Sequence, residues 1–285
     1  MKTSMRQLLA ACCLCIVTAI SQAQDAKRGQ YLAAVGGCVG CHTEEKKDAV
    51  PFAGGRALTT PFGTFFGPNI TPHPQAGIGG WSEADFIKAL REGTRPDGAH
   101  YYPAFPYTSF TKIVDVDLRD LYAFLKSVPP SARASQPHDL KFPFGFRILN
   151  MVWKWLFFTP GPFVTDASKS QEVNRGAYLV QALAHCGECH TPRNFLGVSS
   201  RDLFLAGGKS PENKGIPNLT PTRLKKWSDP ELIQYLQTGL TSDGDSAADP
   251  MSEVISNSLA KLTSPDINAI VGYLRSLLPL PEDKK

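Results

Sequence analysis

The sequence predicts an all-α protein made of two tandem helical domains. Two observations predict this fold class: an internal repeat that covers most of the chain, and amphipathic segments with the 3.6-residue period and the capping residues of helices. A third agrees with them, because no segment shows the sustained polar–apolar alternation of a half-buried strand. We expect the first domain at residues 24–128, a linker at 129–165 and the second domain at 166–285.

The internal repeat consists of matching segments that occur in the same order in each half. The pairs are Arg28-Gly-Gln-Tyr31 with Arg175-Gly-Ala-Tyr178, Pro68-Asn-Ile-Thr-Pro72 with Pro217-Asn-Leu-Thr-Pro221, Trp81-Ser-Glu-Ala-Asp85 with Trp227-Ser-Asp-Pro-Glu231, and the runs that begin at Asp117 and Asp266.

The predicted helices carry start and stop signals. Ser82 and Ser228 each stand three residues before an acidic residue, in the manner of a capping box, and Gly93 and Gly239 supply the stops. Each half has roughly 100 residues, which is too few for a generous apolar core. We therefore expect each domain to depend on a bound cofactor to fold.

The first 23 residues have the pattern of a cleaved export signal. Lys2 and Arg6 precede a 13-residue apolar run, and Ser21-Gln-Ala23 offers small residues for cleavage after Ala23. We therefore expect a periplasmic protein. A lipoprotein box ending at Cys12 is the alternative, but five residues between Arg6 and Cys12 are too few for an apolar segment of roughly 7–15.

The charge of the chain excludes one class of partner. The 30 basic and 26 acidic residues give +4, and loss of Lys2 and Arg6 lowers this to 28 − 26 = +2. Nucleic-acid binding requires clustered basic residues on a strongly basic domain, so we expect no nucleic acid as partner. After residue 23 the sequence contains no run of about 18 apolar residues, so it predicts no membrane-spanning helix there.

The cysteines form a repeated motif. Of seven, Cys12, Cys13 and Cys15 lie in the leader, and the other four belong to two Cys-x-x-Cys-His motifs. No cysteine is left for a structural disulfide in an oxidising compartment. The motif residues are Cys38, Cys41, His42, Cys186, Cys189 and His190.

The spacing of this motif has a chemical reason. Two thiols about one helical turn apart suit thioether bonds to the vinyl groups of one haem, and the following histidine falls under the iron as its ligand. A zinc site or a thioredoxin-like pair are the alternatives, but the latter requires a βαβ pattern that the sequence lacks. We therefore predict two covalently attached haem c groups, with His42 and His190 on the irons.

The second domain offers a methionine as sixth iron ligand. Beyond the leader only Met151 and Met251 remain, and Met251 lies 24 residues after Trp227. We predict Met251 as the distal ligand, with a core methionine as the alternative. The same count from Trp81 reaches Phe105 in the first domain.

The first domain contains no methionine, so its sixth ligand is a separate question. His100 is the strong ligand nearest to Phe105, and bis-histidine ligation is our leading interpretation. A five-coordinate or water-bound iron behind Phe105 is the main alternative, and His73 is a weaker candidate ligand. His100 facing solvent or a haem propionate is the purely structural interpretation.

The linker contains a dense run of aromatic and apolar residues at 142–158. It predicts either a helix that packs the two halves together or a surface for a partner protein or a membrane, because large exposed apolar patches usually mark interfaces. Its helical stretch is too short to span a bilayer, which needs about 20 residues.

Several of these segments together resemble a known family. Pro68-Asn-Ile-Thr-Pro72, Tyr102-Pro-Ala-Phe-Pro-Tyr107, Phe142-Pro-Phe-Gly-Phe-Arg147 and Asn174-Arg-Gly-Ala-Tyr-Leu-Val180 are similar to the multihaem cytochrome c subunits of membrane-bound alcohol and gluconate dehydrogenases, and of molybdenum hydroxylases acting on nicotinate or isoquinoline. The resemblance implies two class I cytochrome c domains, Met251 on the second iron, and electrons passing from a dehydrogenase partner towards quinone or a terminal oxidase.

Two departures from that family matter. Its members often have three haem domains and a C-terminal membrane anchor, whereas this sequence has two haem motifs, and many carry methionine where Phe105 stands. An electron-transfer protein without catalytic residues is our leading interpretation. The alternative is a haem enzyme, or a gas- or peroxide-reactive protein, that uses an open iron in the first domain.

Overall fold

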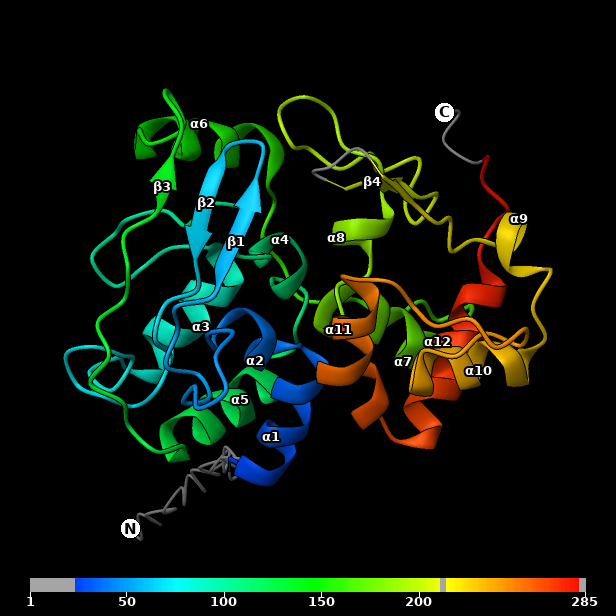
Figure 1. The fold of residues 1–285 in the computed structure, drawn as a ribbon, viewed down its shortest axis with the longest axis horizontal. Helices are drawn as coiled ribbons and strands as arrows, with labels where there is room; N and C mark the ends of the chain where they lie inside the picture. The colour runs from blue at the N-terminus through cyan, green and yellow to red at the C-terminus, as the bar shows by residue number, and fades with distance from the viewer. Residues whose placement is uncertain (1–23, 211–213, 282–285) are drawn as a thin grey trace, which may run out of the picture.

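The computed structural model describes residues 24–210 and 214–281, so the predicted export signal lies outside the described residues. Two similarly built halves lie side by side (Figure 1). The first repeat, residues 24–128, contains α1 (Ala26–Val35), α2 (Cys38–Cys41), β1 (Ala57–Thr60), β2 (Gly63–Phe66), α3 (Glu83–Glu92), α4 (Tyr107–Phe110) and α5 (Asp115–Ser127).

The second repeat follows the same order. After β3 (Asp139–Leu140) and α6 (Arg147–Phe157) it contains α7 (Gln171–Tyr178), the π-helical turn η1 (Leu179–Leu183), α8 (Gly187–His190), β4 (Gly208–Lys209), β5 (Gly215–Ile216), α9 (Pro221–Leu224), α10 (Asp229–Thr238), α11 (Met251–Asn257), the 3₁₀ turn η2 (Leu259–Lys261) and α12 (Ser264–Ser276).

In each repeat the first and last long helices cross at very short range. A Cβ on Gly29 of α1 would lie 1.9 Å from the Asp120 carbonyl oxygen of α5, and a Cβ on Gly176 of α7 would lie 1.9 Å from the Ala269 carbonyl oxygen of α12. Only glycine, which has no side chain, permits this approach. The glycine of the repeated Arg-Gly-x-Tyr segment is therefore a helix-crossing residue.

The arginine of that segment ties the same two helices together. Arg175 reaches Asp266 of α12 with two hydrogen bonds of 2.7 Å, the two-pronged geometry that arginine and carboxylate favour. Arg28 instead bridges two carboxylates of α5, with one bond to Asp117 and one to Asp120. Each crossing thus combines close backbone packing with an ion pair.

The tyrosine of the segment joins the two repeats to each other. The Tyr31 hydroxyl of the first repeat donates to Asp266 of the second over 2.6 Å, and the Tyr178 hydroxyl of the second donates to Asp117 of the first over 2.6 Å. Asp117 and Asp266 are only 1% and 7% exposed. Burial, reinforced by these carboxylates, raises the pKa of both tyrosines, so both stay protonated and donate. Each buried carboxylate therefore receives an arginine from its own repeat and a tyrosine from the other.

The apolar core is shared as well. One continuous cluster of buried side chains includes Leu32, Phe86 and Leu118 from the first repeat and Leu179 and Ile267 from the second. The two repeats therefore form one packed body and are not independent domains on a flexible linker.

The all-α expectation is incomplete, because two small sheets occur. β1 and β2 form an antiparallel hairpin in which Thr60 pairs with Gly63 across a two-residue turn, β3 extends it, and β4 pairs with β5. Strands of two to four residues are too short to give a visible alternation, which is why the sequence pattern did not predict them.

The predicted linker packs against both repeats. β3 joins the sheet of the first repeat, and α6 turns Asn150 and Lys154 onto the same repeat. Trp153 Nε1 of α6 donates to the Leu196 carbonyl oxygen of the second repeat over 2.9 Å. Among the described residues, no helix has both the length and the apolar character needed to cross a membrane.

The substitution Gly176→Ala should lower the free energy of unfolding by roughly 2–3 kcal/mol, because the new methyl group must push α7 and α12 apart. The urea-unfolding midpoint, followed by circular dichroism, measures the change. Gly161→Ala is the matched control, since a Cβ there meets nothing within 4 Å, and it should change stability by less than about 0.5 kcal/mol. Equal midpoints for the two variants would contradict the role assigned to the crossing.

Candidate haem sites

The two Cys-x-x-Cys-His motifs lie on the short helices α2 and α8. All four cysteines are free. Burial raises the pKa of Cys38 and of Cys186 to about 12. A reactive redox pair needs a thiol with a lowered pKa, so these thiols do not have the environment of a thioredoxin-like site.

The histidine of each motif is held in one protonation state by a proline carbonyl. His42 Nδ1 lies 2.8 Å from the Pro68 carbonyl oxygen, and His190 Nδ1 lies 2.7 Å from that of Pro217. Because a carbonyl only accepts, the proton of each neutral ring sits on Nδ1 and the lone pair on Nε2. Burial lowers the pKa of both histidines and favours the neutral ring. Both rings therefore present the nitrogen that a haem iron binds.

The Pro-Asn-x-Thr-Pro loops that supply these carbonyls are locked by their buried asparagines. Asn69 Oδ1 accepts from the backbone N–H and the hydroxyl of Thr71, and Asn218 Oδ1 does the same with Thr220. The amide of Asn69 donates to backbone carbonyls at residues 131 and 133, and that of Asn218 to the carbonyl at residue 280. In each repeat, one asparagine thus fixes the loop under the histidine to the chain that follows the last helix.

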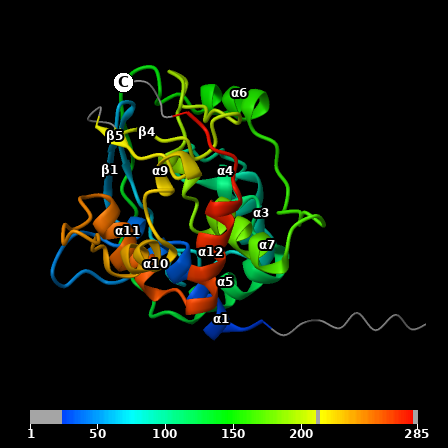
Figure 2. The same ribbon diagram turned by 90° about the vertical axis from the view of Figure 1, so that its right-hand side faces the viewer.

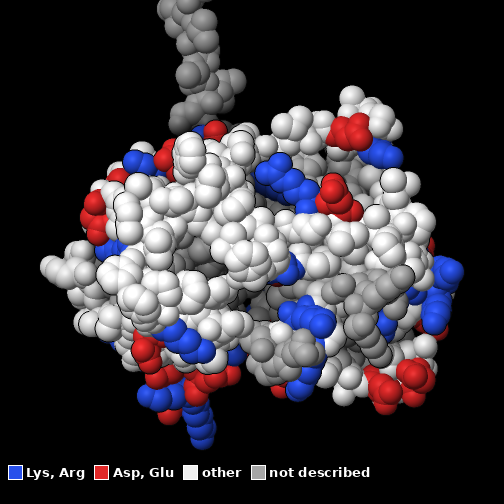
Figure 3. Space-filling view, turned by 90° about the horizontal axis from the view of Figure 1, so that it is seen from above, with Lys and Arg blue, Asp and Glu red and all other residues white. Residues whose placement is uncertain are grey.

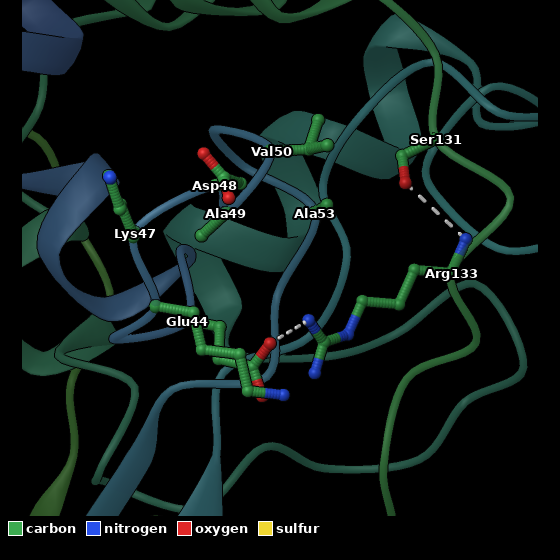
Figure 4. Close-up of a pocket in the computed structure, with 9 residues that line it drawn as sticks. Glu44, Lys47, Asp48, Ala49, Val50, Ala53, Ser131 and Arg133 are labelled. Carbon is green, nitrogen blue, oxygen red and sulfur yellow. Dashed lines mark hydrogen bonds and ion pairs between the residues drawn. The ribbon is translucent and has the colours of Figure 1, made fainter.

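A second contact fastens the same chain beside the first motif. Arg133 forms an ion pair with Glu44, two residues after His42, and its backbone N–H donates to the Ser131 hydroxyl (Figure 4). Arg133 is the main cause that lowers the pKa of Glu44 to about 2. These residues line a pocket of about 320 Å³ at the edge of the loop that leaves the motif.

Met251, the predicted ligand of the second repeat, and Phe105 of the first occupy equivalent places in the two repeats. Met251 begins α11 and Phe105 lies just before α4, each after a loop closed by an isolated bridge: Thr94 to His100 in the first repeat, Leu240 to Ser246 in the second. Met251 is half-buried against the shared core. Phe105 packs its ring against Tyr101, 5.1 Å between centroids.

His100 lies at the bridge, so its counterpart in the second repeat is Ser246 rather than Met251. Its Nδ1 is 3.0 Å from Lys154 Nζ. Burial lowers the pKa of Lys154 to about 8, so the ammonium is still the main form at pH 7 and donates to His100. This places the His100 proton on Nε2. Ligation of iron through Nε2 would require that proton to move and Lys154 to turn away, so His100 as a ligand stays a prediction.

Each motif contacts the other repeat across the interface between them. Glu188, inside the second motif, accepts from Thr108 of α4 over 2.8 Å and also from Ser109. In the opposite direction α11 lies against α2: a Cβ on Gly40 would be 3.4 Å from Asn257 Nδ2. Each motif therefore contacts a helix of the other repeat that begins at Met251 (α11) or just after Phe105 (α4).

Comparison with known proteins agrees with this geometry. The cytochrome c family model matches residues 26–129. A dihaem cytochrome of the c type from Cereibacter sphaeroides is 47% identical over 255 residues, which are 88% of this chain and 85% of that protein. This chain belongs to the cytochrome c family. The cytochrome carries two covalently attached haem c groups.

Other relatives of the cytochrome are parts of dehydrogenases. The fructose dehydrogenase cytochrome subunit of Gluconobacter japonicus is 44% identical, over 88% of this chain and 52% of that protein. A nicotinate dehydrogenase subunit of Pseudomonas putida is 43% identical, over 90% of this chain but only 22% of that protein. The cytochrome thus spans about half of one relative and less than a quarter of the other. These relatives support electron transfer as the function class.

The residues present fit the two haem groups. Each motif offers two unpaired thiols one helical turn apart and a neutral imidazole whose free nitrogen is Nε2. Cys38, Cys41 and His42 would hold one haem, and Cys186, Cys189 and His190 the other. Sequence reasoning missed the asparagine locks, although the matched Pro-Asn-x-Thr-Pro segments signalled them. It also missed Lys154, which stands alone inside an apolar run.

The substitution Lys154→Met should lower the free energy of unfolding by about 2 kcal/mol, because it leaves the Glu92 and Gly93 carbonyl oxygens at the end of α3 without their donor. Thermal unfolding of the haem-loaded protein measures it. Lys141→Met, at an exposed lysine in the same segment, should change stability by less than about 0.5 kcal/mol. Equal losses in both variants would mean that Lys154 does not hold the end of α3.

Proposed function

We propose that this cytochrome is a periplasmic electron carrier that accepts electrons from a dehydrogenase partner and passes them towards quinone or a terminal oxidase. Each repeat would be one class I cytochrome c domain, and residues 1–23 would be removed after export. The dehydrogenase subunits among the relatives support the partner, and the signal pattern in the sequence supports the location.

The observation that carries the proposal is that each haem motif contacts the other repeat. Glu188 of one motif is bound by Thr108 and Ser109, and α11 rests on the other motif. Such packing holds both motifs at the one interface between the repeats. A chain built this way suits the passage of an electron from one site to the other.

Bound haem supplies a one-electron iron couple at each site, and the axial ligands set much of its potential. The proline carbonyl accepts the Nδ1 proton of each histidine, which fixes the orientation of the ring. The same hydrogen bond makes Nε2 more basic and therefore a stronger ligand for iron. Met251 is the proposed distal ligand of the second site, and a thioether ligand raises the potential. With His100 or no strong ligand at the first site, electrons would run from the first repeat to the second.

A second candidate function rests on Phe105. This residue stands where the second repeat has Met251, and it is surrounded by aromatic rings, among them Tyr101 and Phe110. A first iron without a sixth protein ligand would be open to peroxide or to a small gas molecule. The candidate activity would then be a haem enzyme or sensor rather than a carrier.

Spectroelectrochemical titration of the mature protein should resolve two potentials, with the second-repeat haem the higher of the two. Met251→His should lower that potential by removing the thioether, and should leave the first-repeat haem unchanged. One common potential for both haems in the wild type would contradict the proposed direction of electron transfer from the first repeat to the second.

Binding of carbon monoxide to the reduced protein distinguishes the electron carrier from the enzyme or sensor with an open iron. A carrier with six-coordinate irons should bind none in the reduced state, whereas rapid binding at one haem would favour the open-iron function. Low-temperature electron paramagnetic resonance of wild type and His100→Ala identifies the ligand. An unchanged first-haem signal in the variant would rule out His100.

A further inference from the structure

Helix α6 has the reverse of the polarity expected for a helix on a water-soluble surface. Within the helix, the polar residues Asn150 and Lys154 are 6% and 8% exposed and face the protein, and Arg147 at its start donates to the His100 carbonyl oxygen. Its opposite face consists of apolar side chains that are 42–82% exposed. They are Ile148, Leu149, Met151, Val152, Trp155 and Leu156, which we call the α6 face. A helix normally turns such a face inwards, so this one is built to meet an apolar medium.

The polar side of α6 is anchored, so its orientation is not accidental. Asn150 donates to the Tyr101 carbonyl, and Lys154 binds the end of α3 through the Gly93 carbonyl at 2.9 Å. Trp153 adds the bond to the second repeat. Turning the helix over would bury the apolar face only at the cost of all these bonds. The protein therefore presents the α6 face by construction.

Neighbouring segments extend the apolar surface. The loop before α6 exposes Phe142 by 85% and Phe146 by 56%, and the loop that Trp153 contacts exposes Phe195 by 86%. The helix lies at one end of the molecule, opposite α1 (Figures 1 and 2). The part of this end that carries α6 shows few charged side chains away from its margin (Figure 3).

The charge of residues 140–165 indicates which kind of partner the α6 face binds. From Leu140 to Thr165 there is no aspartate or glutamate, while Lys141 is exposed beside Phe142. Phenylalanine, tryptophan and leucine flanked by basic residues are typical of helices that lie in the interfacial layer of an anionic bilayer. An 11-residue helix cannot cross the bilayer, but it can lie flat with one face in the lipid.

We propose that the α6 face and the Phe142–Phe146 loop bind the surface of a membrane with anionic headgroups. The aromatic and aliphatic side chains enter the boundary between headgroups and acyl chains, and Lys141 meets the phosphates. Because α6 is bonded to both repeats, this contact fixes how the haem sites stand relative to the membrane. The attachment is peripheral, and salt weakens it.

Flotation of the haem-loaded mature protein with vesicles tests the proposal, with the Soret absorbance as readout. Vesicles of phosphatidylglycerol and phosphatidylethanolamine should carry the protein to the top of the gradient, and vesicles of phosphatidylcholine alone should carry less. Leu149→Ser/Leu156→Ser should weaken binding by about tenfold or more, because two apolar side chains no longer enter the lipid. Lys141→Glu should weaken binding to the anionic vesicles alone.

The matched control is Val50→Ser/Leu240→Ser. These side chains are 47% and 45% exposed, close to the 46% and 55% of Leu149 and Leu156, but they lie outside the α6 face. This variant should float like the wild type. A wild type that stays at the bottom, or a Leu149→Ser/Leu156→Ser variant that floats unchanged, would overturn the proposal. So would a dimer in sedimentation velocity that this variant dissociates, because the α6 face would then cover a second copy.

Discussion

The structure depends on two buried carboxylates, Asp117 and Asp266. A carboxylate out of water is costly unless charged and hydrogen-bonding partners surround it. Each of these has an arginine from the helix that crosses its own and a tyrosine from the other repeat. Neither carboxylate is satisfied unless the helices cross within the repeat and the repeats dock on each other. Folding of each half and pairing of the halves are therefore linked by the same two side chains.

This docking decides where the haem motifs lie. Once the first and last helices of both repeats are fixed, α11 meets α2 and α4 meets the second motif, so each motif contacts the other repeat. Inside each site, the asparagine lock holds the proline carbonyl on the histidine ring.

Much of this could be predicted from the sequence because the chain contains an internal repeat, so its two halves can be compared with each other. Two copies of Cys-x-x-Cys-His and of Arg-Gly-x-Tyr predict two haem groups and the repeated helix pair, and the family matches agree with the two haem groups. The capping boxes at Ser82 and Ser228 also occur as predicted. These features are local or follow a fixed spacing, which is what sequence patterns record.

The remainder depends on contacts between distant residues. The sequence marks Tyr31 and Tyr178 as repeated, but which aspartate each one binds is set by the docking of the repeats. Strands of four residues, such as β1, leave no periodic signal. The inverted polarity of α6 could not be predicted for the same reason. An apolar run around Lys154 does not show which face of the helix will pack against the core.

The rate at which an electron equilibrates between the two haems tests the central claim most directly. After a reducing pulse to the mature protein, haem spectra would be followed in time at several protein concentrations. The account predicts a first-order exchange within each molecule, with a rate independent of concentration, because the crossed tyrosine–aspartate bonds hold the motifs together. An exchange rate proportional to protein concentration would contradict it, since electrons would then move only between separate molecules.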